Sequence, residues 1–149
     1  MPERTQSAIS ISAPAQAVLD VIADVESYPA WAGGVRRVSI LATREARVEE
    51  AEFVVDTGIL KDTYVLRYTW DVSQDSTGVV SWTLVRAQSL AALDGSYTLE
   101  ALDGGTQVTY RLAVELKVPL PGLLRRRAEK SIVGTALDDL RTRVEADRA

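Results

Sequence analysis

The chain has 149 residues, of which 46% are hydrophobic and 26% charged, as expected for one soluble globular domain over residues 1–149. It contains no cysteine and no histidine, which excludes disulfides, thiolate nucleophiles, zinc enzymes and Ser-His-Asp systems. The net charge of −4 argues against nucleic acid as a partner, because phosphate binding depends on a basic surface. We therefore predict a protein without a metal site or a cofactor, whose acid–base groups are limited to carboxylates, phenols, hydroxyls and basic side chains.

The sequence also carries no targeting or membrane-spanning signal that we recognise. No apolar run approaches the ~20 residues that a transmembrane helix needs. Residues 1–5 are not followed by the apolar segment of a secretory signal peptide. The expectation is a cytoplasmic protein.

The first quarter of the chain predicts a strand followed by one or two short helices. Isoleucine alternates with serine over residues 5–12, which is a strand pattern. Pro14 suits the first turn of a helix, and apolar residues recur after it with helical spacing. These are Val18, Val21, Ile22 and Val25. Pro29 disfavours helical geometry at Tyr28, so a short second helix or turn is expected there, ending at Gly33-Gly34.

Residues 35–117 predict about six strands joined by turns. The last strand has the clearest alternation, with apolar residues at every second position from Val108 to Leu116. Residues 74–78 and 102–105 have the composition of turns. Short connections and one apolar face per strand indicate an antiparallel sheet with one face solvated, and helices at the two ends of the sequence indicate an α+β fold.

Acidic residues cluster around Phe53. They are Glu49, Glu50, Glu52 and Asp56. If Phe53 points inward, strict alternation places Glu49 and Ala51 on its side, and a shift of one residue exchanges the two sides. We interpret the cluster as a solvated edge, and we expect Arg67 and Arg86 to point to solvent as well.

A single helix is predicted from about residue 121 to about residue 145. At 1.5 Å per residue such a helix spans roughly 37 Å, enough to cross a whole sheet. Its predicted buried stripe is Val133, Ala136, Leu137, Leu140 and Val144. Small residues also occupy its middle, namely Ser131, Gly134, Thr135 and Ala136. Small residues on a covering helix leave space beneath a curved sheet, so the architecture predicts a pocket.

Aromatic residues on the inner face of the sheet are candidates for the wall of this pocket. A mostly apolar cavity with a few O–H and N–H groups is the usual composition of a small-molecule site. Taken alone, an aromatic stripe on strands is more often ordinary core than the wall of a pocket, so the prediction depends on the topology. The candidate ligand-binding residues are Tyr28, Trp31, Phe53, Tyr64, Tyr68, Trp70, Trp82, Tyr97, Tyr110 and Gly134.

Two segments resemble the START-like helix-grip superfamily (SRPBCC), in particular its polyketide cyclase/dehydrase and lipid-transport branch. They are residues 9–18 (ISISAPAQAV) and residues 24–31 (DVESYPAW), and the final helix around residues 132–140 is also similar. The resemblance implies a seven-stranded curved antiparallel sheet that wraps a long C-terminal helix, with two short helices after the first strand and a deep apolar cavity. It places Tyr28 and Trp31 at the edge of that cavity.

The resemblance leaves three functions open, because no catalytic motif accompanies the fold. The first is a carrier or binding protein for a lipid, quinone or aromatic polyketide, favoured by the missing histidine and cysteine. The second is a polyketide cyclase or aromatase, in which a tyrosine would move protons. The third is an interaction protein with a vestigial pocket. Portal elements are expected at Ile59, Leu60 and the turn over residues 119–121.

One basic cluster lies in the predicted final helix. It consists of Arg125, Arg126, Arg127 and Lys130. The simpler interpretation is a solvated helix face, and the alternative is transient contact with an anion or a membrane surface.

Overall fold

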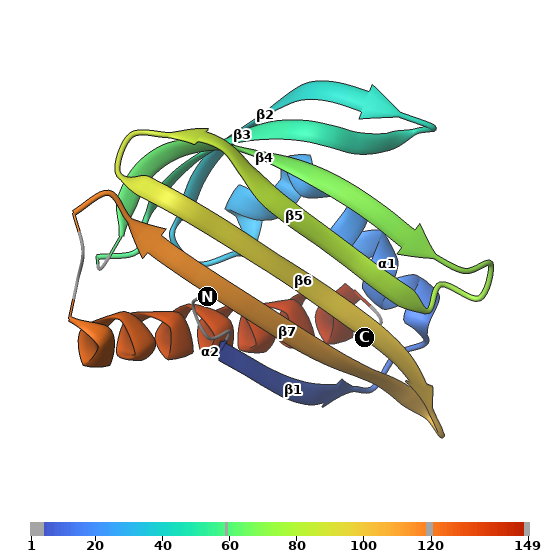
Figure 1. The fold of residues 1–149 in the computed structure, drawn as a ribbon. Coiled ribbons are helices and arrows are strands. Elements are labelled where there is room, and N and C mark those ends of the chain that lie inside the picture. Colours follow the sequence, from blue (N-terminus) through green and yellow to red (C-terminus); the bar gives the residue numbers. More distant parts are fainter. Residues whose placement is uncertain (1–4, 59, 119–120, 148–149) are drawn as a thin grey trace.

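The computed structural model describes residues 5–58, 60–118 and 121–147, and its centre is one antiparallel sheet of seven strands. The strands are β1 (Thr5–Ile11), β2 (Val35–Arg44), β3 (Arg47–Asp56), β4 (Lys61–Val72), β5 (Gly78–Ala87), β6 (Leu90–Leu102) and β7 (Gly105–Leu116). Their spatial order is β1-β7-β6-β5-β4-β3-β2, so every connection but one joins neighbours (Figure 1). The predicted helix-grip α+β fold is confirmed.

Three helices complete the fold: α1 (Ala15–Ala23), the 3₁₀ helix η1 (Val25–Ala30) and α2 (Gly122–Asp147). Pro14 precedes α1, and Val18, Leu19 and Ile22 of that helix are buried. The short η1 contains Pro29, in keeping with the predicted second helix. The long α2 buries the stripe Val133, Leu137, Leu140 and Val144, while Ala136 is only half-buried.

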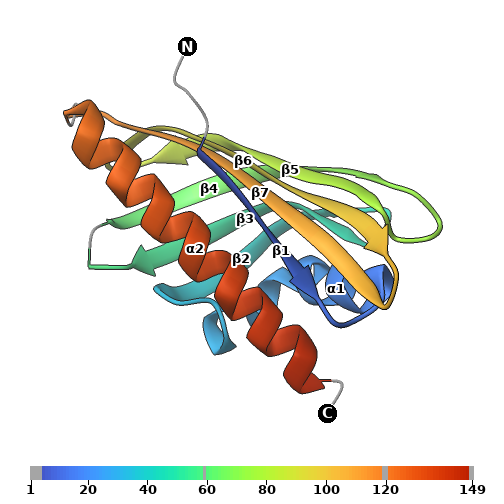
Figure 2. The same ribbon diagram turned by 90° about the horizontal axis from the view of Figure 1, so that it is seen from below.

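Helix α2 crosses beneath the concave face of the sheet, alongside β1 and β7 (Figure 2). Three carboxylates of this helix accept hydrogen bonds from backbone N–H groups of three other segments. The pairs are Glu129 with Val114 (2.8 Å), Asp139 with Gly33 (2.8 Å) and Glu145 with Ser12 (3.0 Å). Val114 lies on β7, Ser12 follows β1 and Gly33 follows η1. The helix is therefore fixed both to the side of the sheet that β1 and β7 form and to the segment after η1.

The alternation expected around Phe53 is interrupted by a bulge. Phe53 and Ala51 face the core, but the pairing with β2 shifts so that Glu49 is an extra residue and Val48 is buried in its place. The conditional prediction that Glu49 shares the inner side with Phe53 is therefore wrong. Glu49 lies 3.9 Å from Arg44 at the surface.

The other predictions for charged residues near this sheet agree with the structure. Arg86 is exposed, and the exposed Arg67 forms an ion pair with Glu50 at 2.7 Å. Among the residues described, no helix is both long and apolar enough to cross a bilayer.

Candidate functional site

A cavity of about 600 Å³ lies between the concave face of the sheet, η1 and α2. Its size is within the ~300–1,000 Å³ range of ordinary small-molecule sites. The sheet supplies most of the wall, α2 supplies Ser131, Ile132, Thr135 and Ala136, and η1 supplies Tyr28. The interior is therefore not filled by side chains.

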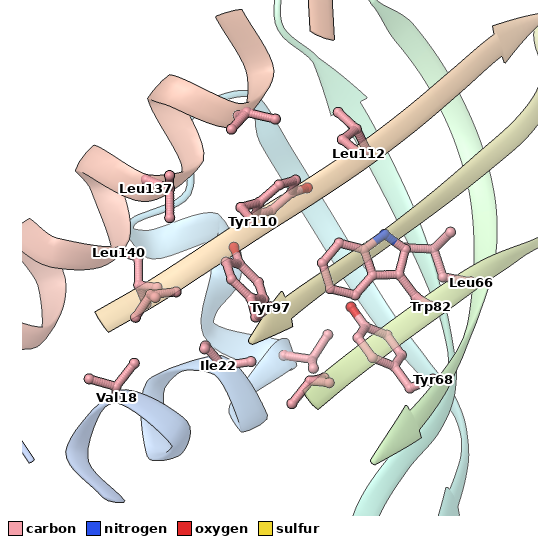
Figure 3. Close-up of a cluster of buried hydrophobic side chains, with 14 of the residues drawn as sticks. Val18, Ile22, Leu66, Tyr68, Trp82, Tyr97, Tyr110, Leu112, Leu137 and Leu140 are labelled. Carbon is pink, nitrogen blue, oxygen red and sulfur yellow. The ribbon is translucent and has the colours of Figure 1, made fainter. Parts of the chain in front are cut away.

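Eight of the chain's nine aromatic residues line this cavity, including all five tyrosines. They are Tyr28, Trp31, Phe53, Tyr64, Tyr68, Trp82, Tyr97 and Tyr110. Figure 3 shows Tyr97 and Tyr110 between Leu137 of α2 and the indole of Trp82. The rings of Tyr97 and Tyr110 meet edge to face at 4.8 Å, and Trp82 lies 5.4 and 5.6 Å from them. These mutual contacts hold the aromatic wall in place without filling the space in front of it.

The position of Trp82 depends on a glycine opposite it. Trp82 on β5 is paired with Gly95 on β6, and the indole lies directly over that glycine. A Cβ atom at Gly95 would be 2.5 Å from Cζ2 of the indole, closer than any stable contact. Gly95 is thus a site residue that the sequence did not single out, because a glycine inside a strand indicates close approach without identifying the partner.

The tyrosine hydroxyls give the apolar wall its polar points. The Tyr28 hydroxyl donates to the carbonyl of Ile22 and neighbours the hydroxyl of Tyr68. Within the described part of the chain, the hydroxyls of Tyr64, Tyr97 and Tyr110 have no hydrogen-bond partner. Phenols usually find a partner when buried, so three donors in the cavity remain available to a ligand.

Burial raises the pKa of every one of these tyrosines above the ordinary phenol value. It is the main cause for all five, and for Tyr28 the neighbouring Tyr68 and Tyr110 add to it. The five phenols are therefore neutral donors at ordinary pH. A wall of this kind is suited to neutral oxygen acceptors, such as carbonyls or hydroxyls on an apolar ligand.

The mouth of the cavity is more polar than its interior. The lining residues that are exposed to solvent mark its position, and they are Gly33, Arg36, Thr57, Gly58, and Ser131 and Thr135 of α2. Asp139 bridges part of it by accepting the hydrogen bond from Gly33, and Asp56 accepts one from the N–H of Gly58 at 3.1 Å. The two acidic residues among the lining residues thus lie at the mouth, each already holding a backbone N–H.

Two predicted site residues lie outside this lining. Trp70 stacks on Tyr68 at 5.6 Å and donates its indole N–H to the carbonyl of Val48 at 2.7 Å, so it anchors β4 to β3. Gly134 faces open space, since a Cβ atom there would meet nothing within 4 Å. Of the predicted portal, Leu60 lines the cavity and Pro121 is exposed, while Ile59, Pro119 and Leu120 lie outside the described residues.

Two buried carboxylates that the sequence did not indicate serve the fold instead. Asp62 accepts backbone N–H groups of Thr63, Gln88, Ser89 and Leu90 at 2.7–3.1 Å, which fixes the turn between β5 and β6. Glu129 accepts one bond from Val114 and one from the Thr5 hydroxyl, each at 2.8 Å. Neither lines the main cavity, and in the described part of the chain no group of His, Cys, Asp or Glu could hold a metal ion.

The sequence matches the family model described as "Polyketide cyclase / dehydrase and lipid transport" over residues 11–141. The chain belongs to this family. A comparison with curated proteins gives no match.

Solved structures with the same fold carry names that point to different activities. A START superfamily protein from Mycobacterium smegmatis superposes with a TM-score of 0.87 at 18% identity, covering 96% of this chain and 97% of its own. A STAR-related lipid transfer protein from Xanthomonas axonopodis has a TM-score of 0.80 at 16% identity, covering 95% and 85%. The Zhui aromatase/cyclase from a Streptomyces species has a TM-score of 0.77 at 17% identity, and the match covers 100% of this chain and 97% of that protein. Likeness at this identity establishes the shared fold, so the activity must be argued from the cavity.

Proposed function

We propose that the protein binds one hydrophobic small molecule of the lipid, quinone or aromatic polyketide class in this cavity and acts as a carrier or binding protein. The observation that supports it is the open space of about 600 Å³ behind a wall of aromatic rings. Family membership supports binding of a hydrophobic small molecule in general terms. An interaction protein with a vestigial pocket is disfavoured, because a vestigial pocket would be filled.

The free phenol hydroxyls narrow the chemistry of the ligand. Tyr64, Tyr97 and Tyr110 offer neutral donors from three different strands, β4, β6 and β7. An unbranched hydrocarbon would leave all three unpaired in an apolar site, which is unfavourable. A flat or folded molecule that carries several carbonyl or hydroxyl oxygens would pair with them.

A titration with an apolar fluorescent probe tests the proposal. The variant Trp82→Ala removes a large part of the wall, while Trp70→Ala removes an indole that lies outside the lining and is the matched control. We expect Trp82→Ala to weaken probe binding at least tenfold, about 1.4 kcal/mol, and Trp70→Ala to change it little. Unfolding by urea, measured on both, separates binding from stability. Equal probe affinity for the two variants and the parent would refute the proposal.

The second candidate is a polyketide cyclase or aromatase. The family description and the phenols at the cavity favour it, since a tyrosine can donate or relay a proton during cyclisation. Against it, the acidic residues Asp56 and Asp139 lie at the mouth and hold backbone N–H groups. Incubation with a poly-β-ketone mimic distinguishes the two, because a carrier returns the compound unchanged and a cyclase converts it.

A further inference from the structure

Large apolar side chains are exposed at one end of the molecule, where β7 ends and α2 begins. Val118 is 78% exposed, Leu123 70% and Leu124 48%. The other large exposed apolar residues of the described chain, Leu41, Val85 and Leu102, are 37–47% exposed and lie on separate strands. Clustered exposed apolar residues mark an interaction surface more often than single ones do.

Basic residues surround this apolar cluster. Residues 117–130 contain five Lys and Arg and one acidic residue, a net charge of +4, whereas the whole chain has −4, so the remainder carries −8. The one acid, Glu129, is buried against β7 and β1, while Arg126, Arg127 and Lys130 are exposed. The outward charge of this segment is thus positive on an otherwise acidic protein. We call Val118, Leu123, Leu124, Arg126, Arg127 and Lys130 the basic end.

The basic end adjoins the mouth of the cavity. Leu124 precedes Ser131 by seven residues and Thr135 by eleven, close to two and three helical turns, so the three share a face of α2. Ser131 and Thr135 line the cavity. Both views show that α2 begins at the same end of the molecule at which β3 ends and β4 starts (Figures 1 and 2). Between β3 and β4, Thr57, Gly58 and Leu60 also line the cavity.

We propose that the basic end docks the protein on an anionic phospholipid bilayer. Val118, Leu123 and Leu124 lie at the level of the headgroups and upper acyl chains, and Arg126, Arg127 and Lys130 contact the lipid phosphates. Exposed leucines beside cations are the combination that an interfacial segment uses, whereas cations alone would suit any acidic partner. Docking in this way brings the mouth of the cavity to the membrane surface. The docking itself does not depend on the proposed ligand and can be tested without it.

Co-sedimentation with vesicles tests this inference. The parent protein is expected to bind vesicles of phosphatidylcholine mixed with phosphatidylglycerol, to bind phosphatidylcholine alone weakly, and to be released by salt. The variant Arg126→Gln/Arg127→Gln/Lys130→Gln should lose about 100-fold in affinity for the vesicles, since each of the three cations near an anionic surface contributes roughly fivefold. Leu123→Ser/Leu124→Ser should lose about tenfold or more in affinity for the vesicles, because the apolar contact with the bilayer is removed.

Matched controls use exposed residues elsewhere. Arg37→Gln/Arg44→Gln/Arg86→Gln removes the same number of charges, and Leu41→Ser/Val85→Ser removes two exposed apolar side chains that lie on separate strands. Both should bind vesicles like the parent. Probe binding in the cavity, measured on every variant, reports whether the fold is intact and whether the proposed ligand function stands.

The possible outcomes separate the two proposals. Vesicle docking without probe binding would contradict the ligand function alone. The inference would be overturned if the parent did not bind anionic vesicles, or if the control variants lost as much vesicle affinity as the basic-end variants. It would also be overturned if only the removal of charge, and not the removal of the leucines, lowered vesicle affinity. If the basic end captured an acidic protein and not vesicles, the surface would belong to a protein partner and the inference would fail.

Discussion

The indole of Trp82 lies on Gly95, the residue directly opposite it in the neighbouring strand, at a distance that leaves no room for a Cβ atom. This single contact sets how far the indole extends into the cavity. Any side chain at Gly95 would displace the indole from its place over the sheet, into the space that a ligand would occupy.

Replacement of Gly95 by alanine is therefore expected to affect both stability and binding. The displaced indole should lower the free energy of unfolding by about 1–3 kcal/mol, as overpacking does, and should weaken binding of an apolar probe. Urea unfolding and probe titration measure the two effects. An unchanged probe affinity in Gly95→Ala would show that the indole does not control the cavity.

Gly134→Ala is the matched substitution on the covering helix. Its new methyl group meets nothing within 4 Å, and alanine is the better helix former, so stability should rise by about 0.5–1 kcal/mol. Probe affinity should stay the same, because Gly134 is not part of the lining. Thermal unfolding and the same titration check this, and weaker probe binding would mean that Gly134 faces the cavity after all.

The free and the paired tyrosine hydroxyls are expected to behave in opposite ways. Tyr110→Phe removes a hydroxyl without a partner, so stability should change by less than about 0.5 kcal/mol, while affinity for a carbonyl-bearing ligand falls about tenfold. Tyr28→Phe removes the bond to the Ile22 carbonyl and should lower stability by about 1 kcal/mol. Calorimetric titration with a quinone or hydroxy-aromatic compound, paired with urea unfolding, tests both. Loss of stability in Tyr110→Phe without loss of affinity would contradict the assignment of its hydroxyl to the ligand.

The raised tyrosine pKa values make stability depend on alkaline pH. An ordinary phenol titrates near pH 10. The unfolded chain releases these protons near pH 10, whereas the folded protein retains them to higher pH. The free energy of unfolding is therefore unaffected by these phenols below about pH 10. Above it, the free energy of unfolding should decrease by about 1.4 kcal/mol per pH unit for each buried phenol.

Absorbance of tyrosinate near 295 nm, followed with circular dichroism, measures this dependence. We expect tyrosinate to form together with loss of structure, well above pH 10. Tyrosinate that forms near pH 10 in a folded protein would mean that the phenols are open to solvent.

Glu129 is expected to stabilise α2 on the sheet. Glu129→Ala leaves the buried N–H of Val114 without an acceptor and should lower stability by about 2–3 kcal/mol, as loss of a bond to a charged group does. Glu129→Gln retains one acceptor oxygen and offers a donor to the Thr5 hydroxyl, so its free energy of unfolding should fall less than that of Glu129→Ala. Equal stability of both variants, measured by urea unfolding, would contradict a hydrogen-bonding role.

The sequence predicted the fold because its signals are local. Alternation in the strands, the proline before α1 and the spacing along α2 each depend on neighbours in the chain, and the seven strands and the long helix followed from them. The wall of the cavity could also be predicted, since Tyr64, Tyr68 and Trp82 share the inner side of their strands.

Features that depend on contacts distant in sequence could not be predicted. The extra residue Glu49 exchanged the sides of β3 locally, and helical spacing did not indicate whether Gly134 or Thr135 faces the cavity. The buried roles of Asp62 and Glu129 depend on N–H groups 15 to 28 residues away along the chain. Nothing in the local pattern distinguishes these two acids from solvated ones.

The central claim is that the space behind the aromatic wall holds a hydrophobic molecule. Native mass spectrometry of the protein purified gently from its own cells measures this most directly, with organic extraction of the same sample to identify what it carries. The account predicts a complex of one chain with one apolar, oxygen-bearing molecule, reduced in Trp82→Ala. A bare mass for the parent, together with failure to take up any lipid, quinone or aromatic compound offered to it, would contradict the account.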